Sequence, residues 1–256
     1  METYNKRFNL KHLLIIIFIL VIVLAIVISI SQFTFRKEYQ PPTALINMLP
    51  RYRVIDMDNI PIKSDKDGDG INDQKDILMG AKSQLIEPAV NIFSEGLNET
   101  NYYNGGDPPP GLAVCTDIIA RAFKAAGFDI RQLVYEDIRD NFSEYPLRTL
   151  WGQTRPDKDI DYRRIQNLEI FFKRNAKALT LTFNYTSEQD LMKWLPGDIV
   201  FFDMDRDGYT DNAGIISDFT TRKGIPKIIY NYIDPGHTIE SEILTTAKIT
   251  GHYRWQ

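Results

Sequence analysis

The order of two hydrophobic periodicities is the feature that most constrains the fold of this 256-residue chain. Apolar residues recur every three or four positions in 77–93, 115–126 and 162–177, which predicts helices. The last third changes to short runs rich in Ile, Val and Phe at hairpin-scale spacing, which predicts strands. These runs begin at Gly197, Ala213, Pro226 and Ala247. Helices followed by an antiparallel sheet predict an α+β domain.

An uncharged apolar run of 18 residues, 13–30, lies near the amino terminus. A membrane-spanning helix needs about 17–25 residues, and basic residues precede this run, as expected on the cytoplasmic side. A cleaved signal peptide is the alternative, but the run is longer than the usual apolar core of about 7–15 residues and no small-x-small cleavage site follows it. We therefore predict a single-pass cell-membrane protein with a cytoplasmic tail at 1–12, a transmembrane anchor at 13–31, a stalk at 32–63 and an extracellular domain at 64–256.

The charge distribution argues against two classes of partner. Residues 1–12 carry three basic groups and Glu2, a net of +2, so the formal charge of −4 leaves −6 on the rest of the chain. An acidic domain does not favour nucleic acid or an anionic lipid surface. The chain also has one cysteine, so no internal disulfide can stabilise it.

An acidic loop at 65–76 has the spacing of a calcium-binding loop. Carboxylates occupy loop positions 1, 3, 5, 9 and 12, glycine occupies position 6, and position 7 can offer a backbone carbonyl. Calcium needs 6–8 oxygens around one point, and a glycine turn lets alternate side chains converge. We therefore predict a structural Ca²⁺ site, and the pattern resembles a thrombospondin type 3 or dockerin-like calcium loop. The predicted ligands are Asp65, Asp67, Asp69, Ile71, Asp73 and Asp76.

A second acidic loop at 203–211 repeats the first nine positions, but its position 12 is Gly214. Without the last carboxylate, the loop is either a weaker calcium site or a polar hairpin turn, and the sequence leaves both interpretations open. The candidate ligands here are Asp203, Asp205, Asp207, Tyr209 and Asp211.

The single cysteine, Cys115, follows a Pro-rich turn and begins one of the predicted helices. A helix N-terminus stabilises a thiolate through its free N–H groups and its dipole, so Cys115 is a candidate nucleophile. Free cysteine is also a common small buried residue. Local sequence leaves both possibilities open.

Five segments together resemble the bacterial family catalogued as domain of unknown function 1287, which is related to NlpC-type, papain-like cell-wall cysteine peptidases. The segments are 105–117, 156–168, 194–200, 213–218 and 249–254. The resemblance covers roughly residues 65–256. It implies a papain-like α+β domain in which the cysteine-bearing helix packs on an antiparallel sheet.

The resemblance also implies that Cys115 is the nucleophile and that a histidine begins the strand near residue 213. That position holds Asn212, and a neutral amide cannot accept the thiol proton. His237 could substitute as the base only if its loop folds back over Cys115. The expected function is a cysteine amidase or peptidase acting on cell-wall peptides or peptidoglycan. The alternatives are an inactive, calcium-stabilised binding module and a surface scaffold.

Overall fold

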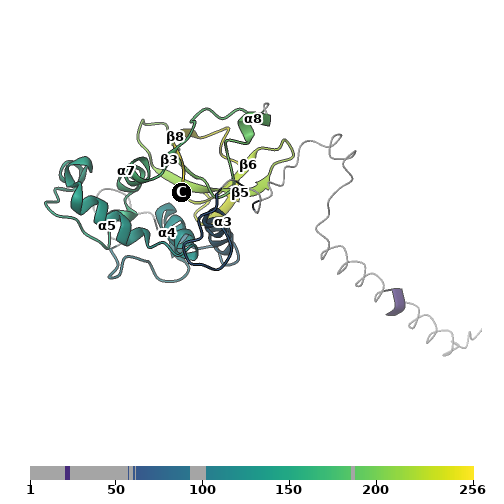
Figure 1. Cartoon of the computed structure of the whole chain (residues 1–256), viewed down its shortest axis with the longest axis horizontal. Coiled ribbons are helices and arrows are strands. Elements are labelled where there is room, and N and C mark those ends of the chain that lie inside the picture. Colours follow the sequence, from purple (N-terminus) through teal and green to yellow (C-terminus); the bar gives the residue numbers. More distant parts are fainter. Residues whose placement is uncertain (1–20, 24–56, 58–59, 61, 93–101, 186–187) are drawn as a thin grey trace, which may run out of the picture. The chain divides into compact units, whose positions relative to one another are not determined.

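The computed structural model describes residues 21–23, 57, 60, 62–92, 102–185 and 188–256 (Figure 1). The chain divides into two compact units, Met1–Leu49 and Pro50–Gln256. Of the predicted transmembrane segment only residues 21–23 are described, as helix, and the rest of that segment and the predicted tail lie outside the described residues. Within the described ranges, no helix has the length and apolar character needed to cross a membrane.

Apart from the helical residues 21–23, the described helices and strands belong to the second unit. The helices are α3 (Asp73–Ser83), α4 (Cys115–Ala125), α5 (Ile130–Asp140), α6 (Leu147–Trp151), α7 (Ile165–Asn175) and α8 (Glu188–Leu191), with 3₁₀ turns at Phe142–Glu144 and Asp161–Arg163. The strands are β1 (Val90–Asn91), β2 (Leu112–Ala113), β3 (Lys177–Ala178), β4 (Ile199–Asp203), β5 (Asn212–Thr220), β6 (Pro226–Asn231), β7 (Thr238–Ser241) and β8 (Lys248–Arg254).

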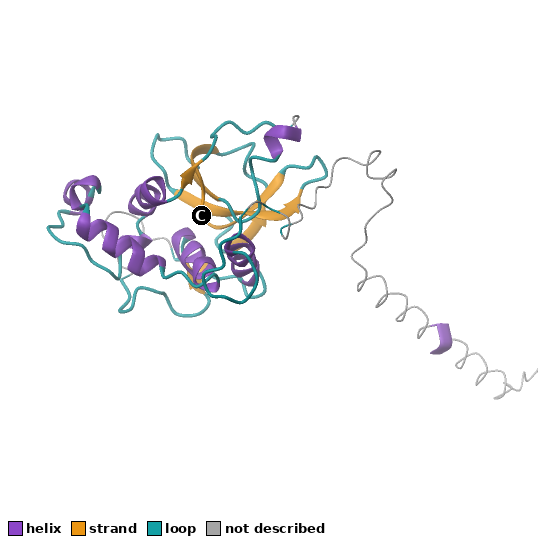
Figure 2. Ribbon diagram, viewed as in Figure 1, coloured by secondary structure: helices purple, strands orange, loops and turns teal. Residues whose placement is uncertain are grey.

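Six strands form one antiparallel sheet in the order β3-β8-β4-β5-β6-β7, and β1 and β2 form a separate parallel pair. Helices α3, α4 and α5 gather on one side of the sheet (Figure 2). The α+β class with an antiparallel sheet, predicted from the order of the two periodicities, is confirmed.

Both faces of the sheet are covered, and this explains why the central strand β4 is apolar at each of its first four positions. Along β4, Ile199 and Phe201 belong to the core shared with the helices, while Val200 and Phe202 belong to a second core on the opposite face. Successive side chains of a strand point to opposite faces, so each core takes every second residue. Burial on both sides replaces the alternating pattern by a continuous apolar run.

The helix carrying the cysteine forms as its apolar stripe predicts. The residues of that stripe are buried, and the chain turns at Gly127 with a φ of +74°, a conformation that glycine adopts readily. The helix predicted over 77–93 is wrong beyond Ser83, because Pro88 lacks an N–H group and interrupts the helix before β1 begins. Phe93, the last residue of that prediction, lies outside the described residues.

Part of the predicted stalk lies against the domain. Met57, Ile60 and Ile62 form a buried apolar cluster with Leu78 and Leu195. The side-chain amide of Asn72 donates to the Met57 carbonyl at 3.0 Å. The chain just before the first acidic loop is therefore held on α3.

Two of the segments that resemble the family meet in a buried polar network. The carboxylate of Asp198 accepts hydrogen bonds from Arg254 at 2.6 Å and from the side chain of Gln74 at 2.8 Å. His252 lies 3.2 Å from the same carboxylate, and its ring stacks on Trp194 at 3.9 Å. The network joins α3 and β8 to the segment just before β4, and buried polar groups that are satisfied in this way stabilise a unique arrangement.

Candidate thiol site and acidic loops

Cys115 is the first residue of α4 and is 7 % exposed. The preceding residue, Val114, is extended, and its N–H donates to Oδ2 of Asp117 at 2.9 Å. The carboxylate of Asp117 therefore caps the start of the helix. The hydroxyl of Thr116 donates to the carbonyl of Arg163 at 3.0 Å, so the first turn of α4 is attached to the 3₁₀ turn Asp161–Arg163.

A buried ion pair anchors the same turn. Nε of Arg163 lies 2.7 Å from Oδ1 of Asp117, and the two side chains are 4 % and 0 % exposed. A second nitrogen of the guanidinium donates to Oδ2 at 3.1 Å, so the pair is bidentate. These contacts fix the backbone that carries the thiol.

The surroundings of the thiol disfavour its ionisation. The pKa of Cys115 is raised to about 12, chiefly by burial and also by the negative charges of Asp117 and Asp211. Backbone N–H groups of Ala213 and Thr116 lie against the sulfur and act in the opposite direction. The thiol is therefore protonated at neutral pH, and an attack by the thiolate needs a base close to the sulfur.

The residue at the position expected for that base is Asn212, the first residue of β5. Its side chain is fully buried, Oδ1 accepts from the N–H of Ala213 at 2.9 Å, and Nδ2 has no hydrogen-bond partner in the described part of the chain. Asn212 thus lies next to the residue that contacts the sulfur. It offers no titratable nitrogen.

His237 does not supply the missing group. Its ring is exposed and lies 3.2 Å from the carbonyl of Pro235, and its backbone forms a β-bridge with Val90. Among the described residues, no hydrogen bond or ion pair joins His237 to Cys115. The described residues therefore show no contact by which the loop of His237 would fold back over the thiol.

Sequence reasoning did not identify the polar pair beside the thiol. The hydroxyl of Tyr232 donates to Oδ2 of Asp211 at 2.9 Å, and the charges of Cys115 and Asp211 influence one another. Burial is the main cause that raises the pKa of Asp211 and of Tyr232. Asp211 directly precedes β5 and Tyr232 directly follows β6, so the two meet through the pairing of these strands, which no sequence signal reveals.

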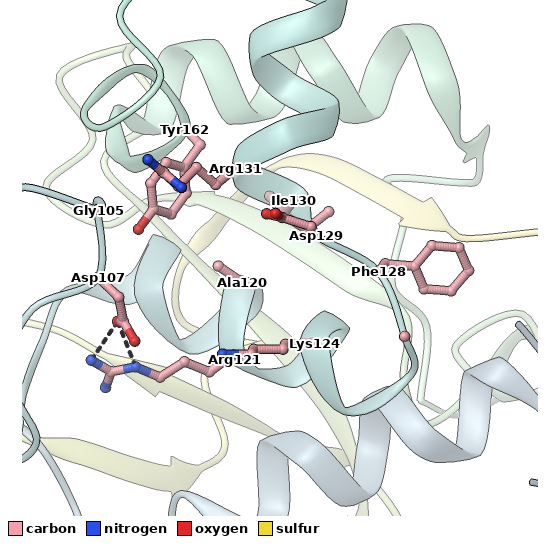
Figure 3. A pocket seen from close by; sticks show the side chains of 11 residues that line it. Gly105, Asp107, Ala120, Arg121, Lys124, Phe128, Asp129, Ile130, Arg131 and Tyr162 are labelled. Atoms are coloured by element: carbon pink, nitrogen blue, oxygen red, sulfur yellow. Dashed lines mark hydrogen bonds and ion pairs between the residues drawn. The ribbon is translucent and has the colours of Figure 1, made fainter. Parts of the chain in front are cut away.

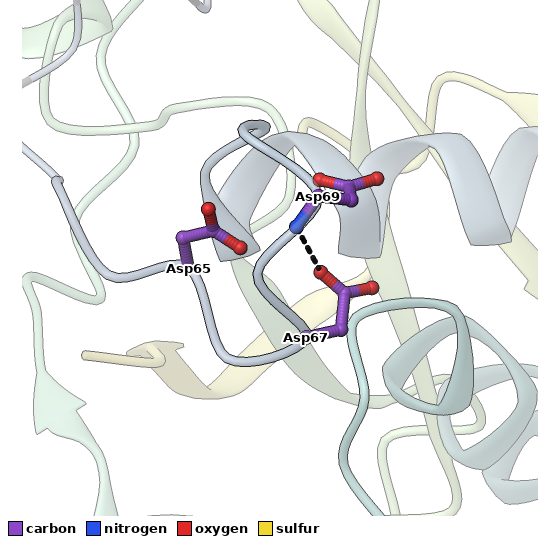
Figure 4. A group of neighbouring side chains, drawn as sticks. All are labelled: Asp65, Asp67 and Asp69. Carbon is purple, nitrogen blue, oxygen red and sulfur yellow. Dashed lines mark hydrogen bonds between the residues drawn. The ribbon is translucent and has the colours of Figure 1, made fainter.

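Three of the five carboxylates of the first acidic loop lie close together. Oxygens of Asp65, Asp67 and Asp69 lie within 4.8 Å of one another on the exposed loop (Figure 4). Asp73 is buried and accepts a backbone hydrogen bond at 2.7 Å, and Asp76 is buried at the first turn of α3. The position-7 residue, Ile71, donates its N–H to Asp69 at 2.8 Å.

The second loop gathers Asp203, Asp205 and Asp207 within the same 4.8 Å. Tyr209 donates its N–H to Asp207 at 2.8 Å, which matches position 7 of the first loop. The loop differs in one contact, because Nζ of Lys248 lies 2.7 Å from Oδ2 of Asp203. The register of β4 with β8 places these two residues opposite each other.

A cavity of about 360 Å³ lies along the C-terminal half of α4 (Figure 3). The cavity is lined by both acidic and basic residues. Some of them form ion pairs, such as Arg121 with Asp107 at 2.7 Å. Lys124 on α4 is exposed. The lining is Gly105, Asp107, Ala120, Arg121, Lys124, Gly127, Phe128, Asp129, Ile130, Arg131 and Tyr162.

A family profile, one curated relative and one solved structure match this chain. The chain matches the solved structure of an N-acetylmuramoyl-L-alanine amidase from Bacteroides uniformis with 11 % identity and a TM-score of 0.42, over 72 % of this chain and 99 % of the other. The uncharacterised protein YijF of Escherichia coli (strain K12) is 37 % identical over 179 residues, which cover 70 % of this chain and 80 % of the relative. The profile of the family described as "Domain of unknown function (DUF1287)" matches residues 85–255, so the chain belongs to this family.

Proposed function

We propose that this chain is a papain-like domain at the cell surface that binds cell-wall peptides without cleaving them. One observation carries the proposal: the buried thiol of Cys115 faces backbone N–H groups and carboxylates, and Asn212 stands where a cysteine hydrolase needs its base. General-base catalysis requires a group that can accept the proton within hydrogen-bond reach. Neither Asn212 nor the exposed His237 meets this requirement.

The cavity along α4 is the proposed binding site. Peptides of the cell wall present free carboxylates and ammonium groups, and the lining offers charges of both signs. Lys124 is the exposed cation of α4 in this lining, and a charged group that reaches a complementary charge steers and orients a ligand. Aromatic and apolar residues, Phe128 and Tyr162 among them, supply the hydrophobic contacts of the cavity.

An amide hydrolase is the second candidate, and one observation favours it. Cys115 begins a helix, and two backbone N–H groups lie against its sulfur, which is the type of donor that stabilises a thiolate or an oxyanion. Under this alternative, Asp211 with Tyr232 would have to handle the proton, since they are the titratable side chains paired beside the thiol.

The cellular location remains part of the proposal. The apolar run 13–30 supports a single-pass anchor with the domain outside the cell. Cell fractionation tests the anchor, and protease treatment of intact cells tests the orientation. A full-length chain found in the soluble fraction, or a domain protected in intact cells, contradicts this assignment.

Calorimetric titration of the purified full-length chain with soluble muropeptides tests the binding function. Cys115→Ala is expected to bind as the parent chain does, whereas Lys124→Glu is expected to bind weakly. Lys173→Glu, an equally exposed charge reversal on α7, is the control and should leave binding unchanged. Binding that depends on Cys115 but not on Lys124 contradicts the proposed site.

A parallel assay for released amines separates the two candidate functions. The binding module predicts no turnover by the parent chain. Turnover that Cys115→Ala abolishes establishes the hydrolase instead. Asn212→His tests whether the base is the missing part, since an imidazole at that position would provide a proton acceptor next to Ala213.

A further inference from the structure

We propose that the loop 65–76 holds one Ca²⁺ ion, whereas the similar loop 203–211 is neutralised by Lys248 and does not need one. The second loop matches the first position by position and is an internal reference for it. The inference concerns stability of the domain and does not depend on the proposed peptide binding.

The two loops share one backbone conformation. At position 1, Asp65 accepts from the N–H of Gly70 at 2.9 Å, as Asp203 does from Gly208 at 3.0 Å. The carboxylates at positions 3 and 5 accept from N–H groups two residues later in both loops. The position-9 carboxylate accepts from the N–H at position 2 in both. This conformation turns alternate carboxylates toward one point, as a calcium loop requires.

A buried oxygen without a partner points to an ion in the first loop. Asp76, at position 12, is 5 % exposed, and its Oδ2 accepts no hydrogen bond from the described residues. The negative charges of the other loop carboxylates, Asp69 and Asp67 first, act on Asp76, so its carboxylate lies close to theirs. Asp76 thus faces the cluster. A buried carboxylate without a partner is costly, and a cation at the centre of the cluster would satisfy it.

In the second loop, a lysine offsets the repulsion between the carboxylates. Asp203 is fully buried and Oδ1 lacks a partner there too, but Nζ of Lys248 lies 2.7 Å from its Oδ2. Position 12 is Gly214, so the loop has one carboxylate fewer. An ammonium group in place of a metal ion, together with a smaller negative charge, lowers the affinity for calcium.

The ion would act on the part of the fold that carries the thiol. The loop leads directly into α3, which packs against α4, and Asp67 contacts Gly127 at the end of α4: a Cβ at Gly127 would lie 3.1 Å from the Cβ of Asp67. Holding the loop therefore holds the start of one helix and the end of the other.

Calorimetric titration with CaCl₂ of the full-length chain, freed of divalent ions by a chelator, tests the proposal. The parent chain is expected to bind one ion and to gain melting temperature in calcium. Asp69→Asn is expected to weaken binding at least about tenfold, because it removes a charged ligand. Asp207→Asn, the matched exposed position of the second loop, is expected to leave affinity and stoichiometry unchanged.

Asp76→Asn gives a second and independent readout. Without calcium it should melt no lower than the parent chain, because it removes a buried charge, and in calcium it should lose the gain in melting temperature. Absence of binding by the parent chain at millimolar calcium overturns the proposal. So does a loss of affinity in Asp207→Asn that equals the loss in Asp69→Asn.

Discussion

The ion pair between Asp117 and Arg163 provides the sharpest test of how the thiol site is held. The exchange Asp117→Asn removes the negative charge but keeps the size of the side chain and one oxygen that can cap α4. The helix cap toward Val114 can therefore persist, and the main loss is the ion pair. Arg163 is then left as a buried cation without its partner.

The magnitude follows from the burial of the pair. Breaking a buried ion pair by removing one partner costs about 3–5 kcal/mol, because an uncompensated charge stays in the interior. The total stability of a domain is about 5–15 kcal/mol, so this loss is a large fraction. The control is Asp140→Asn, since Asp140 pairs with Arg139 at 2.7 Å while both side chains are more than half exposed. Exposed pairs contribute little, and no measurable change is expected for the control.

Urea unfolding of the full-length chain, followed by tryptophan fluorescence, measures both variants. For Asp117→Asn, the urea concentration at the midpoint should fall while the slope of the unfolding free energy against urea concentration stays the same. For Asp140→Asn, the midpoint should be unchanged. Adding Arg163→Met to Asp117→Asn should recover most of the loss, because the unpaired charge is gone. Equal midpoints for Asp117→Asn and Asp140→Asn, or no recovery in the double variant, refute the reasoning.

Two further predictions concern packing and the second loop. Gly80→Ala should destabilise the chain by about 1–3 kcal/mol, measured by urea unfolding, because the new Cβ would lie 2.6 Å from Ala125 and 2.7 Å from a backbone oxygen of α4; a stabilised variant would show that α3 and α4 are not in close contact. Lys248→Met should make the second loop respond to calcium, with two ions bound in calorimetry instead of one; an unchanged stoichiometry would show that Lys248 does not take the place of an ion.

Local patterns predicted those parts of the fold that depend on neighbours in the sequence. These parts include α4 with its end at Gly127, and the strands β4 and β5. They also include the acidic loop in which Asp65, Asp67 and Asp69 lie together. Helix α5 was not predicted, because its buried residues form a narrow stripe. That stripe consists of Ile130, Val134 and Ile138. Asp129, whose side chain accepts from Gln132 at 3.1 Å, is a helix-start signal that could have identified it.

The contacts that decide the chemistry depend on strand register and could not be predicted. Lys248 on β8 lies opposite Asp203 on β4 and pairs with it. Tyr232, just after β6, donates a hydrogen bond to Asp211, just before β5. Such pairs lie far apart in the sequence, and a shift of one residue in register would turn each side chain to the other face. The sequence also left the state of Cys115 open, since its burial and its neighbours come from the packing of α4 on the sheet.

The pH dependence of Cys115 alkylation by iodoacetamide, on the full-length chain, tests the central claim that the thiol has no base. With a pKa of about 12, the thiol is almost entirely protonated at pH 8, so the rate should rise about tenfold per pH unit without a plateau up to pH 10. The urea-unfolded chain is the control and should titrate near the free value of about 8.5. A folded chain whose rate reaches a plateau below that value contradicts the account, because its thiol would be activated.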